Sequence, residues 1–502
     1  MFTRRHFLAA TTLMSTTLLT RTDSFAQAVR FETSLPIPQL IDAKSNGNSV
    51  SLTIGQGTHA YRAGQSVKSF GYSAPVLGPV IRLARGETTA VTIENTMSRP
   101  TTVHWHGLII PGAADGGPHN TIAPGGRWTA SLHVDQPETT AWFHPHPHGE
   151  TAEQIYSGLA GMLIVDDGSG EGMGLPHRYG IDDLPLVLQD RVFDQQGTLV
   201  YQPGPMDVMA GYRGNTFIVN GAIAPVARVP AGLVRLRVLN GANARFFDLQ
   251  FSDGRTFHVI ASDGGYLPAP VALRRLLIVP GERYELLVDF TNGAEVVLET
   301  GVDQNMPMMG MMGGGAAAPG GRLMKFEIDP AAAAAVTALP KKLVDVPLLD
   351  RSTIAGRRQF LLNDMMMGGG MMGGMMGGMM GGRGFGRGDR GFGPVMAING
   401  QPFDMKRIDV AAKRGTMELW EIGSQMMAHP FHVHGTQFQI LSVNGQVPPP
   451  HMQGWKDTVV VAREAQILVP LSQLASREQP LMFHCHILEH EDAGMMGQYT
   501  CV

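Results

Sequence analysis

The sequence has few cysteines, few charges and no long apolar run, and each shortage excludes a class of protein. Two cysteines, Cys485 and Cys501, form at most one bridge, so a disulfide framework is excluded. Charged residues make up 16% and the formal net charge is −4, which offers no basic surface for nucleic acid or an anionic membrane. No stretch after residue 26 has about 18 uninterrupted apolar residues, so we expect no membrane anchor there.

The residues that are abundant indicate a large protein with buried cores and many candidate metal ligands. Hydrophobic residues make up 43% of 502 residues, which is enough for about three domains with buried cores. The chain also contains 63 glycines, 31 methionines and 18 histidines, and the last two sets carry most of the functional information.

Residues 1–26 are interpreted as an export signal. Arg4 and Arg5 are followed by Phe7-Leu8, an uncharged apolar run and a small-residue cleavage site at residues 24–26. This arrangement resembles a twin-arginine signal, which carries folded proteins and makes the twin-arginine translocase a partner during export. An ordinary secretory signal is the alternative. The twin-arginine interpretation predicts a periplasmic protein.

The rest of the chain is typical of an all-β protein. Short alternating or β-branched runs, such as Thr89–Glu94 and Leu233–Leu239, are separated by glycine, proline and asparagine, a pattern that favours β-sandwiches. The phrase Phe217-Ile218-Val219-Asn220-Gly221 resembles Met396-Ala397-Ile398-Asn399-Gly400. These repeats predict three domains, at residues 27–170, 175–330 and 341–502.

A Met/Gly-rich insertion at residues 365–393 interrupts the third predicted domain. Residues 365–380 consist of nine methionines and seven glycines. Glycine loses the most backbone entropy on ordering, so this stretch is not expected to form a packed core.

Histidines supply the most informative pattern. Eight of them form four His-x-His pairs, namely His104 and His106, His144 and His146, His432 and His434, and His484 and His486. In a strand, side chains two residues apart point to the same face, so each pair presents two imidazoles together. Imidazole suits copper, zinc, iron or nickel, so the pairs predict metal binding without naming the metal.

The pairs occur in the same order in the first and last thirds of the chain. Phe143-His144-Pro145-His146 resembles Phe483-His484-Cys485-His486, and His104-Trp105-His106-Gly107 resembles His432-Val433-His434-Gly435. If the thirds are repeated domains, the eight imidazoles can meet at the interface of the two outer ones and hold three metal ions.

Cys485 indicates which metal is bound. A strand would point its side chain away from the face of His484 and His486. His490 and Met495 follow Cys485 within ten residues, and the more distant His429, three residues before His432, is expected from a neighbouring strand. Two imidazoles, a thiolate and a weak axial thioether are the ligands of a blue-copper electron-transfer site. A buried, inert cysteine is the alternative.

Together, these motifs resemble all four copper-binding motifs of the multicopper oxidases. Within that family, the export signal and the methionine-rich insertion resemble the bacterial periplasmic copper-efflux (cuprous) oxidases, a laccase-like subgroup. The resemblance implies three cupredoxin-like Greek-key β-sandwich domains and four copper ions: one type 1, one type 2 and a type 3 pair.

The resemblance also assigns ligands. It gives the type 1 copper His429, Cys485, His490 and Met495, and it gives the type 2 copper His104 and His432. It divides the type 3 ligands into two sets, one of His106, His144 and His486 and the other of His146, His434 and His484. The first domain has Thr101 and Pro145 where the third has His429 and Cys485, which fits a single type 1 site.

The same resemblance implies roles in electron and proton transfer. Cys485 is bonded in sequence to His484 and His486, so its thiolate is covalently connected to two ligands of the predicted cluster. Asp115 and Glu491 correspond to family positions that relay protons. Solvated or structural carboxylates are the alternative for both residues.

Methionines suggest the substrate. Thioether sulfur is a soft ligand that favours Cu(I). Met427 matches a family thioether of the substrate-copper site, and Asp364 and Met365, at the edge of the insertion, are further candidate ligands. Gln425 stands where that subgroup usually has an aspartate, and a neutral amide is a poorer partner for a cation.

The sequence therefore predicts a monomeric periplasmic enzyme that couples one-electron oxidation of Cu(I), and of small phenols, to four-electron reduction of O2 to water, with a role in copper tolerance. The main alternative is a laccase acting mainly on phenols and aromatic amines. A copper-sequestering protein, a copper-free structural relative and a copper nitrite reductase are the others. No nucleic-acid partner is expected.

Overall fold

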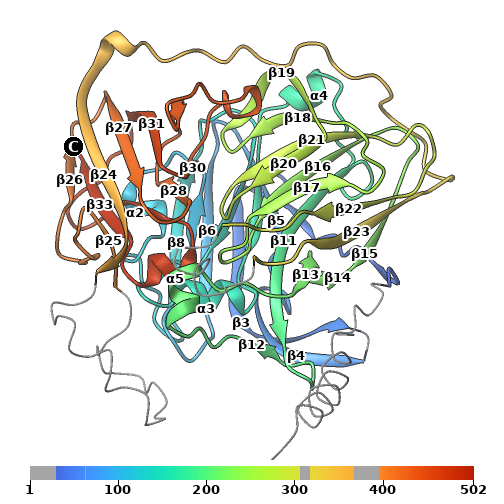
Figure 1. Cartoon of the computed structure of the whole chain (residues 1–502), viewed down its shortest axis with the longest axis horizontal. Helices are drawn as coiled ribbons and strands as arrows, with labels where there is room; N and C mark the ends of the chain where they lie inside the picture. The colour runs from blue at the N-terminus through green and yellow to red at the C-terminus, as the bar shows by residue number, and fades with distance from the viewer. Residues whose placement is uncertain (1–29, 63, 306–316, 367–394) are drawn as a thin grey trace, which may run out of the picture.

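The computed structural model describes residues 30–62, 64–305, 317–366 and 395–502, with only the backbone at 364–366 and 395. The predicted export signal and most of the Met/Gly-rich insertion lie outside the described residues. The described chain consists mostly of strands, arranged in six sheets that pair into three cupredoxin-like sandwiches (Figure 1). The predicted all-β fold class is confirmed.

The first sandwich (blue to cyan in Figure 1) combines a five-stranded and a four-stranded sheet. The first sheet has the order β2 (Leu40–Asp42), β5 (Val80–Ala84), β10 (Gly161–Asp166), β9 (Thr139–His144) and β7 (His104–His106). The second has the order β4 (Gln65–Tyr72), β3 (Ser49–Arg62), β6 (Thr88–Asn95) and β8 (Arg127–His133). Buried residues alternate with more exposed ones along β6, so one face of that strand packs on the core.

The second sandwich (green to yellow) is the largest. Its six-stranded sheet has the order β1 (Thr33–Ser34), β15 (Pro225–Val229), β23 (Gly321–Ile328), β22 (Val296–Thr300), β17 (Phe247–Phe251) and β20 (Arg275–Ile278). Its other sheet contains β14 (Ala222–Ile223), β13 (Thr216–Val219), β11 (Asp183–Phe193), β16 (Leu233–Asn240), β21 (Arg283–Asp289), β18 (Phe257–Ser262) and β19 (Gly265–Leu273), with β12 (Leu199–Val200) paired to β11. The N-terminal strand β1 therefore pairs in parallel with β15 of the second sandwich.

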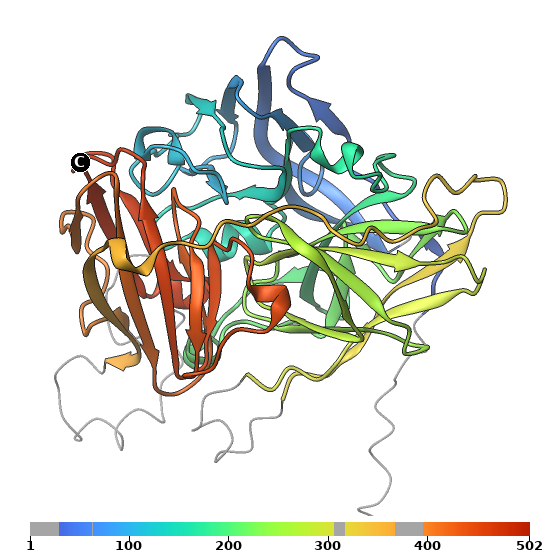
Figure 2. The same ribbon diagram turned by 90° about the horizontal axis from the view of Figure 1, so that it is seen from above.

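The third sandwich (orange to red) pairs two five-stranded sheets. One has the order β25 (Val395–Ile398), β24 (Ile354–Met366), β27 (Thr416–Ser424), β31 (Glu464–Leu471) and β29 (Gln439–Val443). The other has the order β26 (Val410–Ala412), β33 (Met496–Cys501), β32 (Leu481–Cys485), β28 (His429–Val433) and β30 (Thr458–Val461). Between the second and third sandwiches, the described chain from 329 to 350 has no helix or strand and crosses the outside of the molecule (Figures 1 and 2).

Helices are short and lie in the connections. They are α2 (Gly112–Asp115), α3 (Thr151–Tyr156), α4 (Ser169–Gly172), α5 (Pro205–Ala210) and α7 (Leu488–Asp492), with 3-10 turns η1 (Arg351–Thr353) and η2 (Pro450–Met452). No helix within the described ranges is long and apolar enough to cross a bilayer.

The two Asn-Gly phrases noted in the sequence occupy matching turns. Asn220 and Gly221 end β13 with φ of 50° and 80°, and Asn399 and Gly400 end β25 with φ of 53° and 71°. Positive φ at both positions is what a tight hairpin turn requires, and Asn-Gly provides it at low cost. Each asparagine also accepts a hydrogen bond from a neighbouring strand, from Val187 N and Leu361 N respectively.

Strand register brings the histidine pairs together inside each outer sandwich. Antiparallel pairing of β7 with β9 sets His104 opposite His144. Pairing of β28 with β32 sets His432 opposite His484 in the same way. Trp105 alternates with the two histidines of β7 and is buried in the core of the first sandwich. The period of two thus points the histidines away from that core, toward the other sandwich.

Candidate metal centres

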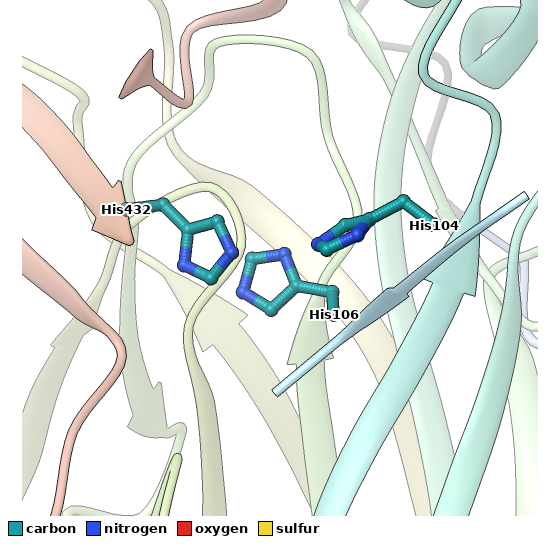
Figure 3. A group of neighbouring side chains, drawn as sticks. All are labelled: His104, His106 and His432. Atoms are coloured by element: carbon teal, nitrogen blue, oxygen red, sulfur yellow. The ribbon is translucent and has the colours of Figure 1, made fainter. Parts of the chain in front are cut away.

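Eight imidazoles meet where the first and third sandwiches face each other. All eight are at most 1% exposed. The ring of His104 stacks on that of His434 with centroids 3.7 Å apart, and the ring of His106 stacks on that of His432 at 3.6 Å. Each stack contains one ring from each sandwich, as Figure 3 illustrates for His106 and His432. The four His-x-His pairs therefore meet at the interface of the two outer sandwiches, as the sequence predicts.

Three of these histidines have the geometry of ligands to one ion. The Nε2 atom of His484 lies 3.3 Å from Nε2 of His146 and 3.1 Å from Nε2 of His434. Metal–nitrogen bonds of about 2.0–2.1 Å place ligand nitrogens about 3.3–3.6 Å apart in tetrahedral or trigonal geometry. The observed separations are close to that range, so this trio fits a single ion.

Two further groups share His106. Candidate ligand atoms of His106, His144 and His486 lie within 4.8 Å of one another, and so do those of His104, His106 and His432 (Figure 3). Within the described structure, His104 Nε2, His106 Nδ1, His144 Nε2 and His432 Nε2 are buried and accept no hydrogen bond. Buried polar atoms without partners are costly, and a metal ion would satisfy them. The residues present therefore fit metal binding by imidazole.

Burial also keeps the rings in the form that binds metal. It lowers the pKa of six of the eight, and neighbouring histidines lower several of them further; the six are His106, His144, His146, His432, His434 and His486. The pKa of His146 falls to about 3 and that of His432 to about 4. These imidazoles are neutral at pH 7, with lone pairs available for a metal.

This burial predicts how the stability of the metal-free protein depends on pH. The unfolded-state pKa of histidine is about 6.5, so below that pH the unfolded chain binds more protons than the folded one. The free energy of unfolding should therefore fall as the pH drops from about 6.5 toward 4 and 3, by about 1.4 kcal/mol per pH unit for each such histidine. Urea unfolding of metal-free protein at several pH values measures this slope.

A His146→Gln variant provides the matched control for this prediction. Below about pH 6.5, the free energy of unfolding of this variant should change less steeply with pH, by the contribution of about one proton. Above that pH, its dependence on pH should be unchanged. A free energy of unfolding that does not change between about pH 6.5 and 4 would contradict the assignment of neutral, buried histidines.

Two aspartates hold the outer nitrogens of the cluster. Asp115, at the end of α2, accepts from His104 Nδ1 through its backbone oxygen (3.0 Å) and from His434 Nδ1 through Oδ2 (2.8 Å). Asp457 accepts from His432 Nδ1 through its backbone oxygen (2.8 Å) and from His106 Nε2 through Oδ1 (3.0 Å). Each aspartate thus fixes one histidine of each sandwich, and this orients the rings.

Asp457 was missed by the sequence reasoning. It lies in Trp455-Lys456-Asp457-Thr458, far from any histidine pair. The available signal was a charged pair directly before the apolar run of β30, because charges rarely enter a strand unless they are paired. Burial tends to raise the pKa of Asp457, but Arg283 and His106 together lower it well below its usual range.

Glu491 contacts the cluster from α7. Its Oε2 lies 3.1 Å from His484 Nδ1, and its Oε1 lies 3.4 Å from His146 Nδ1. The side chain is 1% exposed. Burial tends to raise the pKa of Glu491, but these two histidines lower it below its usual range. Asp115 and Glu491 therefore both touch histidines of the cluster, on different rings.

A second candidate centre lies on the other side of β32. Nδ1 of His429 is 3.3 Å from Cys485 Sγ and 3.2 Å from His490 Nδ1, and Cys485 Sγ is 3.6 Å from His490 Nδ1. Met495 is fully buried in the same core as Cys485. Two imidazoles and a thiol whose ligand atoms lie within 4.8 Å of one another, with a buried thioether in the same core, are the donor types of a blue-copper site.

The second sandwich closes over this centre. His490 Nε2 donates to the backbone oxygen of Met209 in α5 at 3.1 Å. Asn305 exchanges two hydrogen bonds of 2.9 Å with the backbone of Ala428, next to His429. His490 is fully buried, so its ring edge meets α5 rather than solvent.

The structure does not bring the predicted substrate-copper ligands Met427, Asp364 and Met365 together in one described site. Met427 is 5% exposed and packs in the core of the third sandwich, while Gln425 is exposed. Asp364 and Met365 lie at the end of β24, and their side chains are outside the described structure.

Three comparisons place the chain among known proteins. Models of the multicopper oxidase family match residues 53–170, 178–296 and 381–501. The cell division protein FtsP of Salmonella typhimurium is 34% identical over 500 residues, covering 99% of this chain and 98% of that protein.

Solved structures agree in fold. The laccase-like multicopper oxidase CueO of Ochrobactrum sp., described with oxidase activity toward lignin model compounds and lignosulfonate, is 42% identical. It has a TM-score of 0.82 and covers 93% of this chain and 100% of its own. McoA of Aquifex aeolicus is 30% identical, with a TM-score of 0.79 and coverage of 94% and 100%.

Proposed function

Because the chain belongs to the multicopper oxidase family, we propose that it couples one-electron oxidation of Cu(I), and of small phenols, to the four-electron reduction of O2 to water. Four copper ions, one type 1, one type 2 and a type 3 pair, supply the one-electron storage that this reduction needs. The proposed enzyme is a periplasmic monomer, exported by the twin-arginine route, that protects against copper.

The observation that carries this proposal is the continuity of the two centres through one strand. His484 and Cys485 are adjacent at the end of β32, and His486 follows directly. The thiol of Cys485 faces His429 and His490, whereas the ring of His484 faces His146 and His434. An electron accepted at the thiolate side thus has a covalent route of one residue to the cluster side.

The ligand sets of the proposal follow this division. The type 1 set is His429, Cys485, His490 and Met495. The type 2 set is His104 and His432. The type 3 sets are His106, His144 and His486, and His146, His434 and His484. The separations of 3.1–3.3 Å between the Nε2 atoms of the last trio support one of these sets directly.

Asp115 and Glu491 are proposed to bring protons to the cluster. Each carboxylate lies within 3.1 Å of a ring nitrogen that faces away from the proposed metal positions, Nδ1 of His434 and Nδ1 of His484 respectively. Four protons are consumed for each O2 reduced to water. A carboxylate at the edge of a buried cluster is placed to pass them inward from solvent.

The choice of Cu(I) as the main donor rests on soft ligands. Thioethers favour Cu(I), and the Met/Gly-rich insertion at residues 365–393 begins with Met365, directly after Asp364. His490 is buried beneath α5, so a bulky organic donor would not reach its ring directly. The lignin-model activity described for the Ochrobactrum protein supports phenols as additional donors.

The experiment that tests this choice is oxygen uptake by copper-loaded protein. We expect fast uptake with stabilised Cu(I), and phenol oxidation that rises when Cu(II) is added. Fast phenol turnover without added copper, together with weak Cu(I) oxidation, would instead make the protein a laccase acting mainly on phenols and aromatic amines. Copper binding without any uptake would indicate a sequestering protein.

A role in cell division is a second candidate, because the FtsP proteins match nearly the whole chain. A purely structural role needs no metal, whereas this chain buries a complete set of candidate ligands with unsatisfied nitrogens. Purified protein that retains no copper after loading would favour the structural role over the oxidase.

A further inference from the structure

Arg283 is a buried charge of the second sandwich that reaches the network around the cluster histidines, where Asp263 of the same sandwich also accepts from the backbone nitrogens of Asp457 and Thr458. It begins β21 and is fully buried. Its five N–H groups have five acceptors. Nε donates to Thr140 O, Nη1 to Gly281 O and Asp457 Oδ1, and Nη2 to Asp263 O and Asp457 Oδ2. The guanidinium is therefore held in a fixed orientation with no donor to spare.

These acceptors come from all three sandwiches. Thr140 lies in β9, the strand that carries His144, and Gly281 and Asp263 belong to the second sandwich. Asp457 precedes β30 of the third sandwich and receives both arms of the guanidinium, at 2.9 and 2.6 Å. Such a two-armed pairing fixes the plane and position of a carboxylate more tightly than a single hydrogen bond does.

The carboxylate so fixed is the one that holds His106. Its Oδ1 is 3.0 Å from His106 Nε2, while its backbone oxygen holds His432 Nδ1. His106 Nδ1, on the other side of that ring, is buried and has no hydrogen-bond partner in the described structure. The position of that nitrogen therefore depends on how Asp457 is held.

Packing leaves little room for a different arrangement. A Cβ added to Gly107, next to His106, would lie 2.5 Å from Arg283 Nη2 and 3.0 Å from Asp457 Oδ2. A Cβ added to Gly281 would lie 2.7 Å from the ring of His486. Two glycines thus let the guanidinium and its loop approach the ligand-bearing backbone closely.

Asp115 offers an internal comparison. It holds one histidine of each sandwich just as Asp457 does, but the described structure gives it no arginine, and its Oδ1 accepts no hydrogen bond. The matching positions around the cluster therefore differ by one guanidinium, and that guanidinium comes from the sandwich that supplies none of the eight histidines.

We propose that Arg283 is a positioning residue. By holding the carboxylate of Asp457, it sets the orientation of the His106 ring, and with it the ability of the histidine cluster to bind its full set of metal ions. The second sandwich thus takes part in the metal centre without supplying a ligand. This proposal rests on the proposed function for the metal, but it does not depend on which donor the enzyme oxidises.

The test compares Arg283→Lys with Arg245→Lys. Lysine at position 283 keeps the positive charge but cannot donate from two nitrogens to both oxygens of Asp457. Arg245 is a matched control, because it is equally buried and pairs with Asp190 at 2.8 Å, and none of its described hydrogen bonds reaches a cluster histidine. Copper content, the electron paramagnetic resonance of the imidazole-bound Cu(II) and the visible band of the thiolate site are measured for each.

We expect Arg283→Lys to lose about one copper per chain, or to change the resonance of the imidazole-bound Cu(II), while the thiolate band persists. Arg245→Lys should match the wild type in all three. Wild-type copper content and resonance in Arg283→Lys would overturn the proposal, and so would equal changes in both variants. Loss of copper by the wild-type protein itself would instead contradict the proposed function.

A second variant keeps the proposal testable if Arg283→Lys does not fold. Asp457→Asn retains an oxygen for His106 and removes the charge that Arg283 clamps. If Arg283 acts through Asp457, Asp457→Asn should show the same altered resonance, and the double variant should be no worse than Asp457→Asn alone. Additive losses in the double variant, or a wild-type resonance in Asp457→Asn, would overturn the route through Asp457.

Discussion

Cys485→Ser is expected to abolish the oxidation of every external donor while the histidine cluster keeps its copper. A serine hydroxyl stays protonated at neutral pH and is a hard ligand, so it cannot replace a thiolate bound between His429 and His490. Without the thiolate, electrons from a donor would have no entry to the covalent route that leads to His484 and His486. Oxygen uptake, the visible thiolate band and copper content measure the three parts of this prediction.

Cys501→Ser is the matched control for that variant. Cys501 is as fully buried as Cys485 and neither is in a disulfide, but Cys501 lies at the end of β33, where its backbone forms a β-bridge with Ala475. It should retain the visible band, the copper and the turnover. Donor oxidation that survives in Cys485→Ser would remove the basis for the proposed route of electrons.

Asp115→Asn is expected to slow the reduction of O2 by about 10²- to 10⁴-fold, the usual range for loss of a group that transfers protons. Asparagine still offers an oxygen to His434 Nδ1, so the ring should keep its orientation and its metal. The step that slows is reoxidation of the reduced protein by O2, because that step consumes protons. Rapid mixing can separate it from reduction by the donor, whose rate should not change.

Asp115→Glu separates proton transfer from ring positioning. Glutamate restores an ionisable group at a slightly different distance, so part of the lost rate should return, and Glu491→Gln should slow the same step. If Asp115→Asn reoxidises at the wild-type rate, Asp115 only orients His434 and relays no proton.

The histidine cluster could be predicted from the sequence because its pattern is local and repeated. A spacing of two within a strand fixes which side chains share a face, and the recurrence of the motifs indicated that two domains face each other. The register that sets His104 opposite His144 repeats as His432 opposite His484. The strands around Thr89–Glu94 and Leu233–Leu239 were predictable for the same local reason and appear as β6 and β16.

What escaped prediction depends on how the three sandwiches dock. Arg283 and Asp457 are 174 positions apart, and nothing in either local sequence indicates the other. The closure of α5 over His490 also joins segments 281 positions apart. The burial of Met427 in a core, rather than at a surface, follows from the packing of the third sandwich and not from its neighbours in the sequence.

The division of the cluster between two sandwiches also dictates when it can exist. His146 and His484 bring their Nε2 atoms within 3.3 Å although 338 positions separate them. Contacts of such long range form late in folding, since the loop between them must be closed first. During synthesis, residues 432–490 leave the ribosome after residues 104–146, so a nascent chain that has not yet reached them has four histidines of the first sandwich and no partner for them. The cluster is therefore complete only after the third sandwich has been made and has docked on the first.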